Sequence, residues 1–377
     1  MKAEIISIGT EILLGQILNT NQQWLSVKLA ALGIGVYHHS TVGDNPGRLS
    51  NALETGLRRS DIVITTGGLG PTVDDITLQV ISRTFPVESS ITAKNLLGTA
   101  PGFIYGIGGK LLIALPGPPR ELNPMFERSV APFLRKRFRS EGVLKVRTIR
   151  MTGLSESAAD SKVGDLLKCP PPLTVGIYAK PALVELKIMA KAADEKQAKA
   201  LLDRADAKIT SRLGKYIFGR DDETLEGAVG ALLSRSRMTL AVAESCTGGL
   251  ISSRITDVPG SSAYFKTGIV AYSNDIKTRL LGVSSVTLRE HGAVSRQTAV
   301  EMAKNIRRSA GTDIGLSVTG IAGPSGAVKD KPVGLVYIAF SSADRTICRE
   351  FRFRGEREVI KFRSSQAALD LIRVSLL

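Results

Sequence analysis

"DIVITTGGLGPTVDDITLQVISRTF" (residues 61–85) contains one complete strand–loop–helix unit. Residues 62–66 are all β-branched and favour a buried strand, and the glycines that follow favour a tight turn. The segment after the turn places apolar side chains at helical spacing. Repeated along a chain, such units predict a parallel sheet, because each helix returns the chain to the start of the next strand.

Strand and helix patterns alternate through most of the first 142 residues. Strands are expected at "AEIISIG" (3–9), "IGVYHHST" (34–41) and "GKLLIALPG" (109–117), and helices at 21–33, 46–60 and 120–138. This alternation predicts an α/β domain over residues 1–142, with a mostly parallel sheet and helices on both faces.

Glycines and carboxylates follow the strands of this first domain, where ligands bind in such folds. Gly67 and Gly68 can bring backbone N–H groups close to a phosphate. Glu11, Asp74 and Asp75 are oxygen ligands of the kind that Mg²⁺ prefers. The opposing interpretation is that the aspartates cap a helix and the glycines form a turn. Spacing alone does not decide between the two.

Residues 143–220 have a different, α+β pattern. A strand at 145–153, a helix at 155–168, an alternating strand at 183–192 and a helix at 194–214 are expected. Val184, Leu186 and Ile188 should share the buried face of the alternating strand. The βαββα order is similar to that of KH domains, but the GxxG loop of nucleic-acid-binding versions is missing. A spacer or dimerisation role is therefore favoured.

Residues 221–377 return to an α/β pattern. Strands are expected at 239–243, 268–274 and 313–320, a hairpin at 333–355, and helices at 221–237, 295–311 and 356–377. In the first of these helices, Leu225, Val229 and Leu232 should face the core. Ser295 is the expected N-cap of the second.

"AESCTGG" (243–249) joins the first of these strands to a short helix. A serine at such a turn can act as a nucleophile, while the N–H groups that follow stabilise an oxyanion. Gly248 and Gly249 allow a close backbone approach to a ligand. The alternative is that Ser245 or Thr247 only caps the helix.

The base that would activate such a serine is not a clear histidine. His38 and His39 lie in the first domain, and His291 is expected to be a structural residue in a loop between helices. Lys277 lies in the first turn of a helix that follows Tyr272, and the positive end of the helix dipole lowers the pKa of a lysine there. The alternative is an ordinary surface lysine.

The composition indicates a cytoplasmic protein with anionic partners. The formal net charge is +15, which suits phosphorylated small molecules or nucleic acid. Aromatic residues make up only 5%, so few platforms exist for stacking bases, and nucleic acid is the less favoured partner. The three cysteines show no pairing or metal-binding spacing, and no apolar run approaches the ~20 residues of a membrane span. No membrane partner is expected.

Several motifs resemble the competence/damage-inducible CinA family. "GTEILLGQILNTN" (9–21), "TTGGLGPTVDDIT" (65–77) and "LPGPPRE" (115–121) resemble its N-terminal, molybdopterin-binding-like domain. "GLSES" (153–157) and "GIYAKP" (176–181) fit its middle domain, and "AESCTGG", "VPGSSAYFKTGIVAYSN" (258–274) and "SVTGIAGPSG" (317–326) resemble its C-terminal deamidase domain. The resemblance spans nearly the whole chain and implies domains at 1–142, 143–220 and 221–377.

The resemblance implies that the C-terminal domain hydrolyses the amide of nicotinamide mononucleotide (NMN) to nicotinic acid mononucleotide and ammonia, without a cofactor. It places Ser245 as the nucleophile, Lys277 as the general base and Tyr272 as a proton relay or orienting donor. The implied substrate-binding residues are Cys246, Thr247, Gly248, Gly249, Ser262, Thr319, Gly320, Gly323 and Arg357, the last as a phosphate partner.

For the N-terminal domain, the resemblance implies an ADP-ribose pyrophosphatase that uses Mg²⁺, Mn²⁺ or Co²⁺. The implied site residues are Glu11, Gly67, Gly68, Asp74 and Asp75. Between Phe85 and Asn95 the chain has only "PVESSITAK", where family members carry a longer helical stretch, so one wall of this pocket is expected to be missing. A homodimer is the expected assembly. The alternatives are a basic accessory protein for DNA uptake or recombination, or a molybdopterin- or nucleotide-binding protein without deamidase activity.

Overall fold

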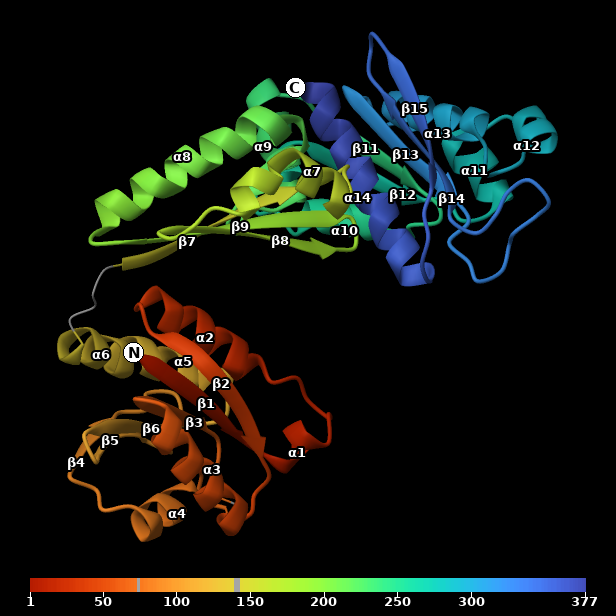
Figure 1. Ribbon diagram of the computed structural model, residues 1–377. Helices are drawn as coiled ribbons and strands as arrows, with labels where there is room; N and C mark the ends of the chain where they lie inside the picture. Colours follow the sequence, from red (N-terminus) through yellow and green to blue (C-terminus); the bar gives the residue numbers. More distant parts are fainter. Residues whose placement is uncertain (73–74, 139–142) are drawn as a thin grey trace. The chain divides into compact units, whose positions relative to one another are not determined.

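The computed structural model describes residues 1–72, 75–138 and 143–377 (Figure 1). The chain divides into two compact units, one of residues 1–146 with 189–202 and the other of residues 147–188 with 203–377. The domain boundaries expected at 142 and 220 therefore stay a prediction. In the described part of the chain, every helix is too short or too polar to cross a membrane.

The N-terminal sheet has six strands in the order β2-β1-β3-β6-β5-β4. Their bounds are β1 (Lys2–Ile8), β2 (Gly35–Val42), β3 (Ile62–Thr66), β4 (Ser89–Ala93), β5 (Gly102–Ile107) and β6 (Lys110–Leu115). The first four in this order are parallel, which confirms the expected sheet, and β5 and β4 add an antiparallel edge. The sequence did not predict these two strands, because β4 is mostly exposed and carries no apolar alternation.

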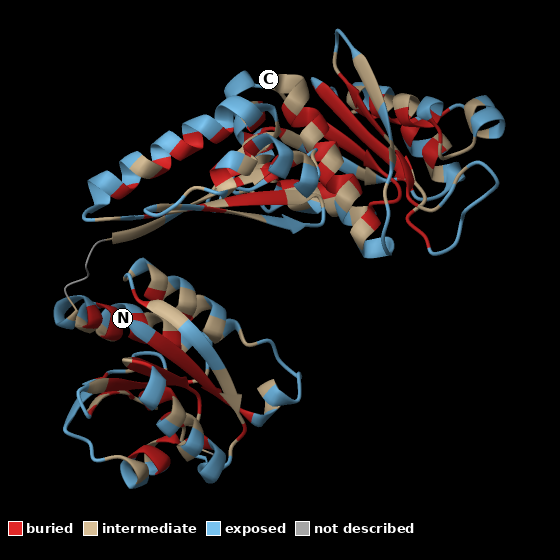
Figure 2. Ribbon diagram, viewed as in Figure 1, coloured by how far each residue is buried: buried red, intermediate tan, exposed pale blue. Residues whose placement is uncertain are grey.

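Helices cover both faces of this sheet, as expected. The helices are α1 (Thr10–Leu13), α2 (Thr20–Ala31), α3 (Pro46–Arg59), α4 (Thr77–Thr84), α5 (Pro119–Met125) and α6 (Ala131–Arg137), with a π-helical segment at Phe126–Val130. Alternate residues of β1 face opposite layers, so Ile5 packs with α2, α5 and α6 while Ile6 packs with α3 and α4. Figure 2 shows both sides of the buried central strands in contact with helices.

The middle module has a four-stranded sheet in the order β10-β7-β9-β8. Its elements are β7 (Val143–Met151), α7 (Glu156–Leu167), β8 (Leu173–Lys180), β9 (Leu183–Ala192), α8 (Glu195–Leu213), a 3₁₀ turn (Gly214–Tyr216) and β10 (Ile217–Arg220). Val184, Leu186 and Ile188 are buried on β9, as the alternation predicted. The βαββα order is that of a KH-like module, followed here by one further strand.

The C-terminal sheet has five strands in the order β12-β11-β13-β14-β15. The elements are α9 (Leu225–Ser236), β11 (Leu240–Glu244), α10 (Leu250–Thr256), a 3₁₀ turn (Ser261–Ala263), β12 (Phe265–Val270), α11 (Asn274–Leu281), α12 (Ser285–His291), α13 (Arg296–Ser309), β13 (Ile314–Gly320), β14 (Leu335–Ser341), β15 (Thr346–Arg352) and α14 (Arg357–Leu376). One face packs against α9, α10 and α14, and the other against α11 and α13. In α9 the buried position is Leu233 rather than the expected Leu232, because i, i+4 and i+8 give the inward stripe 225, 229 and 233.

Candidate active site

Four chain segments meet at one edge of the C-terminal sheet. Strands β11, β12 and β13 are parallel, so residues 245–249, 271–273 and 321–334 all follow carboxyl ends at that edge. Strand β15 runs antiparallel to β14 and pairs Arg352 with Leu335, so it delivers the start of α14 to the same edge. The topology thus gathers the "AESCTGG" turn, Tyr272, the glycine loop and Arg357, although Arg357 follows the turn by more than 100 positions in the sequence.

Ser245 and Lys277 form a buried pair at this edge. Lys277 Nζ lies 3.0 Å from Ser245 Oγ and donates a hydrogen bond of 2.9 Å to the carbonyl of Ala271. Lys277 is 1% exposed and Ser245 is 7% exposed. Ser273 caps α11 by accepting a hydrogen bond from the Ile276 N–H. Lys277 lies four residues after this cap, in the first turn of α11, and its side chain reaches the "AESCTGG" turn. The interpretation of Lys277 as a surface lysine is wrong.

Burial lowers the pKa of Lys277 from that of an ordinary lysine, because the charged ammonium loses its hydration. The sequence analysis also predicted a lowered pKa for Lys277, from the helix dipole, but the loss of hydration on burial is the largest cause. Among the described residues, no carboxylate forms a salt bridge with Lys277 to restore the charged form. A neutral amine at this position can accept the Ser245 hydroxyl proton, while the Ala271 carbonyl holds one of its N–H groups.

A buried glutamate that the sequence analysis did not single out organises the "AESCTGG" turn. The carboxylate of Glu244 accepts from the N–H groups of Gly249, Ile251 and Ser252 at 3.0, 3.1 and 2.8 Å, and from the Ser252 hydroxyl at 2.7 Å. Glu244 therefore caps α10, and the side chains of Ser245 and Thr247 do not. Glu244 is fully buried, and a buried carboxylate requires partners of this kind.

The two glycines of the turn hold conformations with positive φ, 62° at Gly248 and 91° at Gly249, which other residues rarely adopt. Their N–H groups are already used, because Gly248 donates to the Ser245 carbonyl and Gly249 to Glu244. Over the described chain, the N–H groups of Cys246 and Thr247 have no hydrogen-bond partner. The free donors beside Ser245 are thus one and two residues after it, rather than at the glycines.

Cys246 belongs to the hydrophobic core. It is buried among residues of β11, α10 and α14, and this burial raises the pKa of its thiol to about 12. A thiol in this state is not ionised near neutral pH and does not act as a nucleophile. Of the three side chains in the turn, Ser245 is the one in contact with a base.

Tyr272, Arg357 and Gly323 form a second cluster at the same edge. Arg357 donates to the Tyr272 hydroxyl at 2.8 Å and to the Gly323 carbonyl at 2.6 Å. Tyr272 is 62% exposed, and within the described residues its hydroxyl contacts neither Ser245 nor Lys277. Arg357 therefore links the segments after β12 and β13, with both guanidinium ends engaged, which is not the free phosphate partner that was expected.

Three further predicted residues have other positions or partners. The Thr319 hydroxyl donates to the Ala293 carbonyl at 2.7 Å, and a Cβ on Gly320 would come within 2.7 Å of the Leu335 carbonyl oxygen. Both serve local packing. Ser262 precedes β12, whose first residue pairs with Leu240, so it lies at the amino ends of the strands. The placement of Ser262 in the Ser245 site is therefore wrong within this chain.

His291 is the last residue of α12 and not part of a loop, which corrects the sequence interpretation. Its carbonyl accepts from Lys331 Nζ at 2.6 Å. The structure gives it no contact with Ser245 in the described chain, and a Ser–His–Asp triad is thereby excluded for these residues.

Lys361 is a site residue that the sequence analysis missed. It lies on α14 one turn after Arg357, and its Nζ is 3.7 Å from the point that a Cβ on Gly248 would occupy. Lys361 is half-buried and forms no hydrogen bond or salt bridge with any described residue. The i, i+4 spacing from Arg357 was the available signal, since it puts both cations on one face of the helix.

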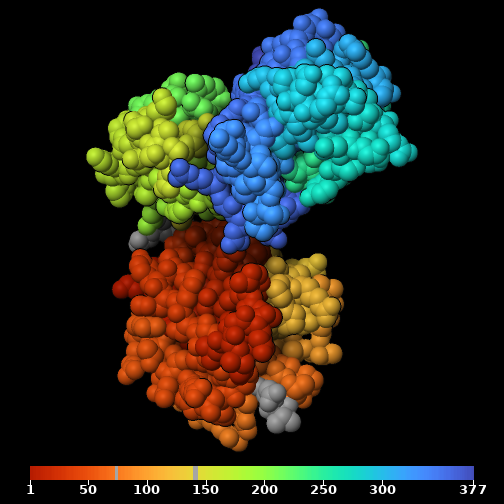
Figure 3. All heavy atoms as spheres, turned by 90° about the vertical axis from the view of Figure 1, so that its right-hand side faces the viewer, coloured from red at the N-terminus to blue at the C-terminus, as the bar shows by residue number. Residues whose placement is uncertain are grey.

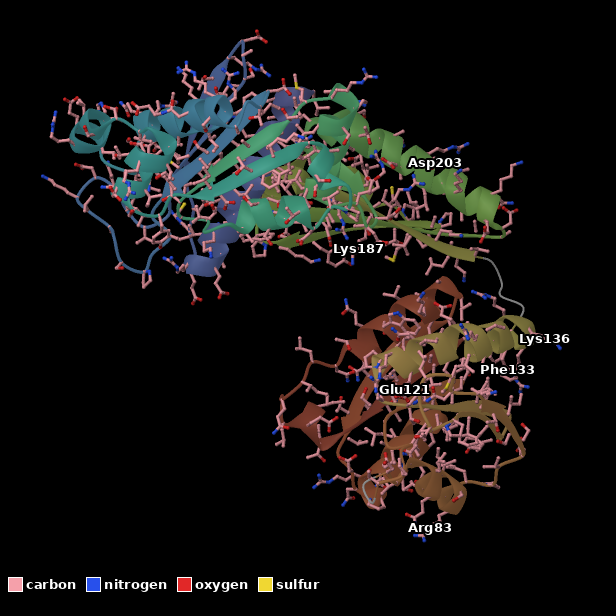
Figure 4. The ribbon with its side chains drawn as sticks, turned by 180° about the vertical axis from the view of Figure 1, so that it is seen from behind. Arg83, Glu121, Phe133, Lys136, Lys187 and Asp203 are labelled. Carbon is pink, nitrogen blue, oxygen red and sulfur yellow. The ribbon has the colours of Figure 1, made fainter. Side chains whose placement is uncertain are left out.

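The N-terminal domain has a cavity of about 610 Å³ beyond the carboxyl ends of its strands. Glu11, Gly67, Gly68 and Asp75 all line it, while Asp74 lies outside the described residues. Residues 97–100, which follow the shortened segment, supply part of the wall, and none of residues 86–94 lines the cavity, so the missing stretch of wall stays a prediction. Figure 4 labels Glu121, on α5, which also lines this cavity.

Asp75 is fixed in its ionised form. Desolvation opposes ionisation, but hydrogen bonds from the side chain and backbone of Thr72 outweigh it and lower the pKa of Asp75. Gly67 (φ 103°) leaves no room for a side chain, because a Cβ would lie 2.4 Å from the Ile8 carbonyl oxygen. Among the described residues there is no group of three acidic, histidine or cysteine side chains placed to hold a metal. Glu11 and Asp75 are the predicted carboxylates that line the cavity, together with Asp44 and Glu121.

Three family profiles match successive parts of the chain. The CinA C-terminal domain matches residues 222–376, the "Probable molybdopterin binding domain" residues 4–136, and the damage-inducible protein CinA KH domain residues 146–219. The competence/damage inducible protein CihA from Agrobacterium tumefaciens, a solved structure, is 38% identical over 40% of this chain and 93% of its own, with a TM-score of 0.39.

Two relatives align over the whole length. A CinA-like protein from Dictyoglomus thermophilum is 44% identical over 411 residues, covering 100% of both chains, and one from Kosmotoga olearia is 43% identical over 100% of this chain and 99% of its own. Both alignments exceed the 377 residues of this chain, so these relatives carry residues that it lacks. On this full-length identity, the chain belongs to the CinA family of competence/damage-inducible proteins.

Proposed function

We propose that the C-terminal domain hydrolyses the carboxamide of NMN, giving nicotinic acid mononucleotide and ammonia. The observation that carries the proposal is the buried contact of 3.0 Å between Ser245 Oγ and Lys277 Nζ, at the ligand-binding edge of the sheet. A serine and a desolvated lysine are a sufficient nucleophile and base for amide cleavage. The test is ammonia release from NMN by the purified chain.

In the proposed reaction, Lys277 Nζ takes the proton as Ser245 Oγ attacks the carboxamide carbon. The oxygen that becomes negative is stabilised by the unpaired N–H groups of Cys246 and Thr247. Lys277 then gives its proton to the departing nitrogen, which leaves as ammonia, and an acyl–serine ester remains. Water, deprotonated by Lys277, hydrolyses the ester and restores Ser245.

Lys361 is the proposed partner of the substrate phosphate, because Arg357 is already engaged by Tyr272 and Gly323. Lys361→Ala should raise the KM for NMN by about 10-fold or more, since a hydrogen bond to a charged group is lost, with kcat little changed. Steady-state kinetics checks this, with Lys304→Ala, an exposed lysine on α13, as the control. Nicotinamide riboside lacks the phosphate, so the wild-type chain and Lys361→Ala should have the same KM for it. A KM effect that persists on the riboside contradicts the assignment.

A second proposed activity is cleavage of ADP-ribose by the N-terminal domain, supported by the cavity that Glu11 and Asp75 line together. Carboxylate oxygens suit Mg²⁺ or Mn²⁺, and such an ion would neutralise the diphosphate. Cleavage should require a divalent cation and be lost with EDTA and in Asp75→Asn. Product analysis by chromatography with Mg²⁺, Mn²⁺ and Co²⁺ is the measurement. No cleavage with any of them would leave this domain a binding role.

A nucleic-acid accessory role remains the less favoured alternative. The basic residues Arg135, Lys136 and Arg137 are exposed at the end of α6, and Figure 4 shows Lys136 pointing away from the sheet. These cations belong to a solvated helix end. The homodimer stays a prediction of the family resemblance, and the cytoplasmic location stays a prediction of the composition.

A further inference from the structure

A second cavity lies in the C-terminal unit, between the middle module and the outer strand and last helix of the C-terminal sheet. It has a volume of about 860 Å³, within the range of ligand pockets. We call it the α14–β15 cleft, and define it by Lys180, Lys215, Arg349, Phe351, Phe353 and Arg363. In Figure 3 the blue residues of β15 and α14 border the yellow-green residues of the middle module. Ser245, Lys277 and Lys361 do not line it.

Two stacked aromatic rings line the cleft. The rings of Phe351 and Phe353 stack with their centroids 5.2 Å apart and their planes 12° from parallel. Both side chains pack against the core on one side and are only partly buried. Partly exposed phenyl rings held in this way form a platform on which a planar heteroaromatic ring can stack.

The cleft is also positively charged, because four cations, Lys180, Lys215, Arg349 and Arg363, line it against two carboxylates, Glu156 and Asp370. Asp370 is occupied by Arg373, and Lys180 is held by Glu185. Arg349 and Arg363, in contrast, form no salt bridge with any described residue. One Arg363 nitrogen donates to the Arg354 carbonyl at 3.1 Å, and its Nε is buried without a partner. An arginine pair beside an aromatic platform is complementary to a phosphate attached to a base.

The cleft shares structural elements with the Ser245 site. Arg363 lies two residues after Lys361 on α14. The Phe353 N–H donates to the Gly334 carbonyl at 2.9 Å, and the Gly334 N–H donates to Ile321 at 2.7 Å, at the two ends of the loop that contains Gly323. A ligand in the cleft would therefore contact both the helix and the strand end that position the phosphate side of the active site.

We propose that the α14–β15 cleft binds a mononucleotide, with its base on Phe351 and Phe353 and its phosphate at Arg349 and Arg363. This is a site separate from the deamidase centre. Its occupancy changes the KM for NMN through α14. The binding claim does not depend on the proposed deamidase activity, and only the change in KM rests on it.

AMP is the probe, because it carries a base and a phosphate but no carboxamide for Ser245 to attack. Isothermal titration of the full-length chain should show AMP binding that Arg349→Glu weakens by about 10-fold and Phe351→Leu by about 5-fold. Phe351→Leu keeps an apolar side chain and removes the ring. Lys304→Glu, the same charge change on the opposite face of the sheet, should leave AMP binding unchanged. Without AMP, Arg349→Glu should turn over NMN at the normal rate.

Three results would overturn the proposal. The first is no AMP binding at all. The second is AMP binding that Lys361→Ala abolishes and Arg349→Glu does not change, which would place AMP in the active site. The third is a ten-nucleotide single strand that binds in an Arg349-dependent way while AMP does not, which would assign the cleft to nucleic acid. Each is read from binding alone, so a failure of the deamidase proposal stays distinguishable.

Discussion

Ser245→Ala is expected to abolish ammonia release from NMN, with a loss in kcat on the order of 10⁴-fold or more. The substitution removes the hydroxyl that lies 3.0 Å from Lys277, and no other described side chain of the turn is hydrogen-bonded to this lysine. The fold should persist, because Glu244 and not Ser245 caps α10. Ammonia release and the thermal unfolding of the same preparation are the two measurements.

Cys246→Ala is the matched control one residue away. The thiol is buried in the core with a pKa of about 12, so its removal should cost stability through a small cavity while most activity remains. If Cys246→Ala were inactive and Ser245→Ala active, the thiol would be the nucleophile. If both stayed active, water would be activated elsewhere and the turn would serve only as a helix start and an oxyanion site.

The positions of Ser245 and Lys277 could be predicted because each depends on local sequence. A buried strand followed by glycines sets the turn at Ser245, and a serine cap sets the first turn of the helix at Lys277. The parallel order of β11 and β12 then brings the two together, since carboxyl ends of parallel strands share an edge. Local patterns therefore predicted most of the fold and the positions of these two residues, whereas their pairing as nucleophile and base was implied by the family resemblance.

The roles of Arg357, Ser262 and Lys361 could not be predicted in this way. Arg357 donates to groups 34 and 85 positions away, and nothing in "FRGERE" indicates that those contacts exist. Ser262 is part of the motif "VPGSSAYF", but it lies at the amino end of β12, opposite the Ser245 site. Lys361 is recognisable as a site residue only from its proximity to Gly248, and this proximity depends on how α14 packs across the sheet. Contacts between distant segments are set by packing, which a single sequence does not specify.

Glu244 is an intermediate case. Its side chain reaches N–H groups only five to eight residues away, so the contact is local. It was overlooked because a glutamate at the end of a strand looks like an ordinary solvent-facing residue. Its bonds to the first N–H groups of α10 leave the N–H groups of Cys246 and Thr247, among the described residues, without a hydrogen-bond partner. The glutamate accepts hydrogen bonds from the N–H groups at the start of α10, which would otherwise need another acceptor at this turn.

Lys277→Met is expected to lower kcat by ~10²–10⁴-fold, the range for loss of a general base, with a smaller effect on KM. Methionine fills a similar apolar volume and has no proton acceptor. Lys277→Arg should be equally impaired, because a guanidinium stays protonated and cannot take the Ser245 proton. Lys304→Met controls for the loss of a lysine. Normal turnover in Lys277→Met would remove the base from the proposed mechanism.

The pH dependence gives the Lys277 assignment an independent test. The active form carries a neutral amine, so kcat/KM should rise with pH, and burial places this rise below the pH at which an ordinary lysine titrates.

The free energy of unfolding should depend on pH in the same direction. The unfolded chain holds the Lys277 proton more tightly, so stability should rise as pH increases from the folded pKa towards that of an unfolded lysine. Lys277→Met should lack this contribution when urea unfolding is compared at pH 7 and pH 9. A wild-type chain whose stability over that interval changes no more than that of Lys277→Met would mean that Lys277 is charged in the folded protein, and that it binds an anion instead of activating Ser245.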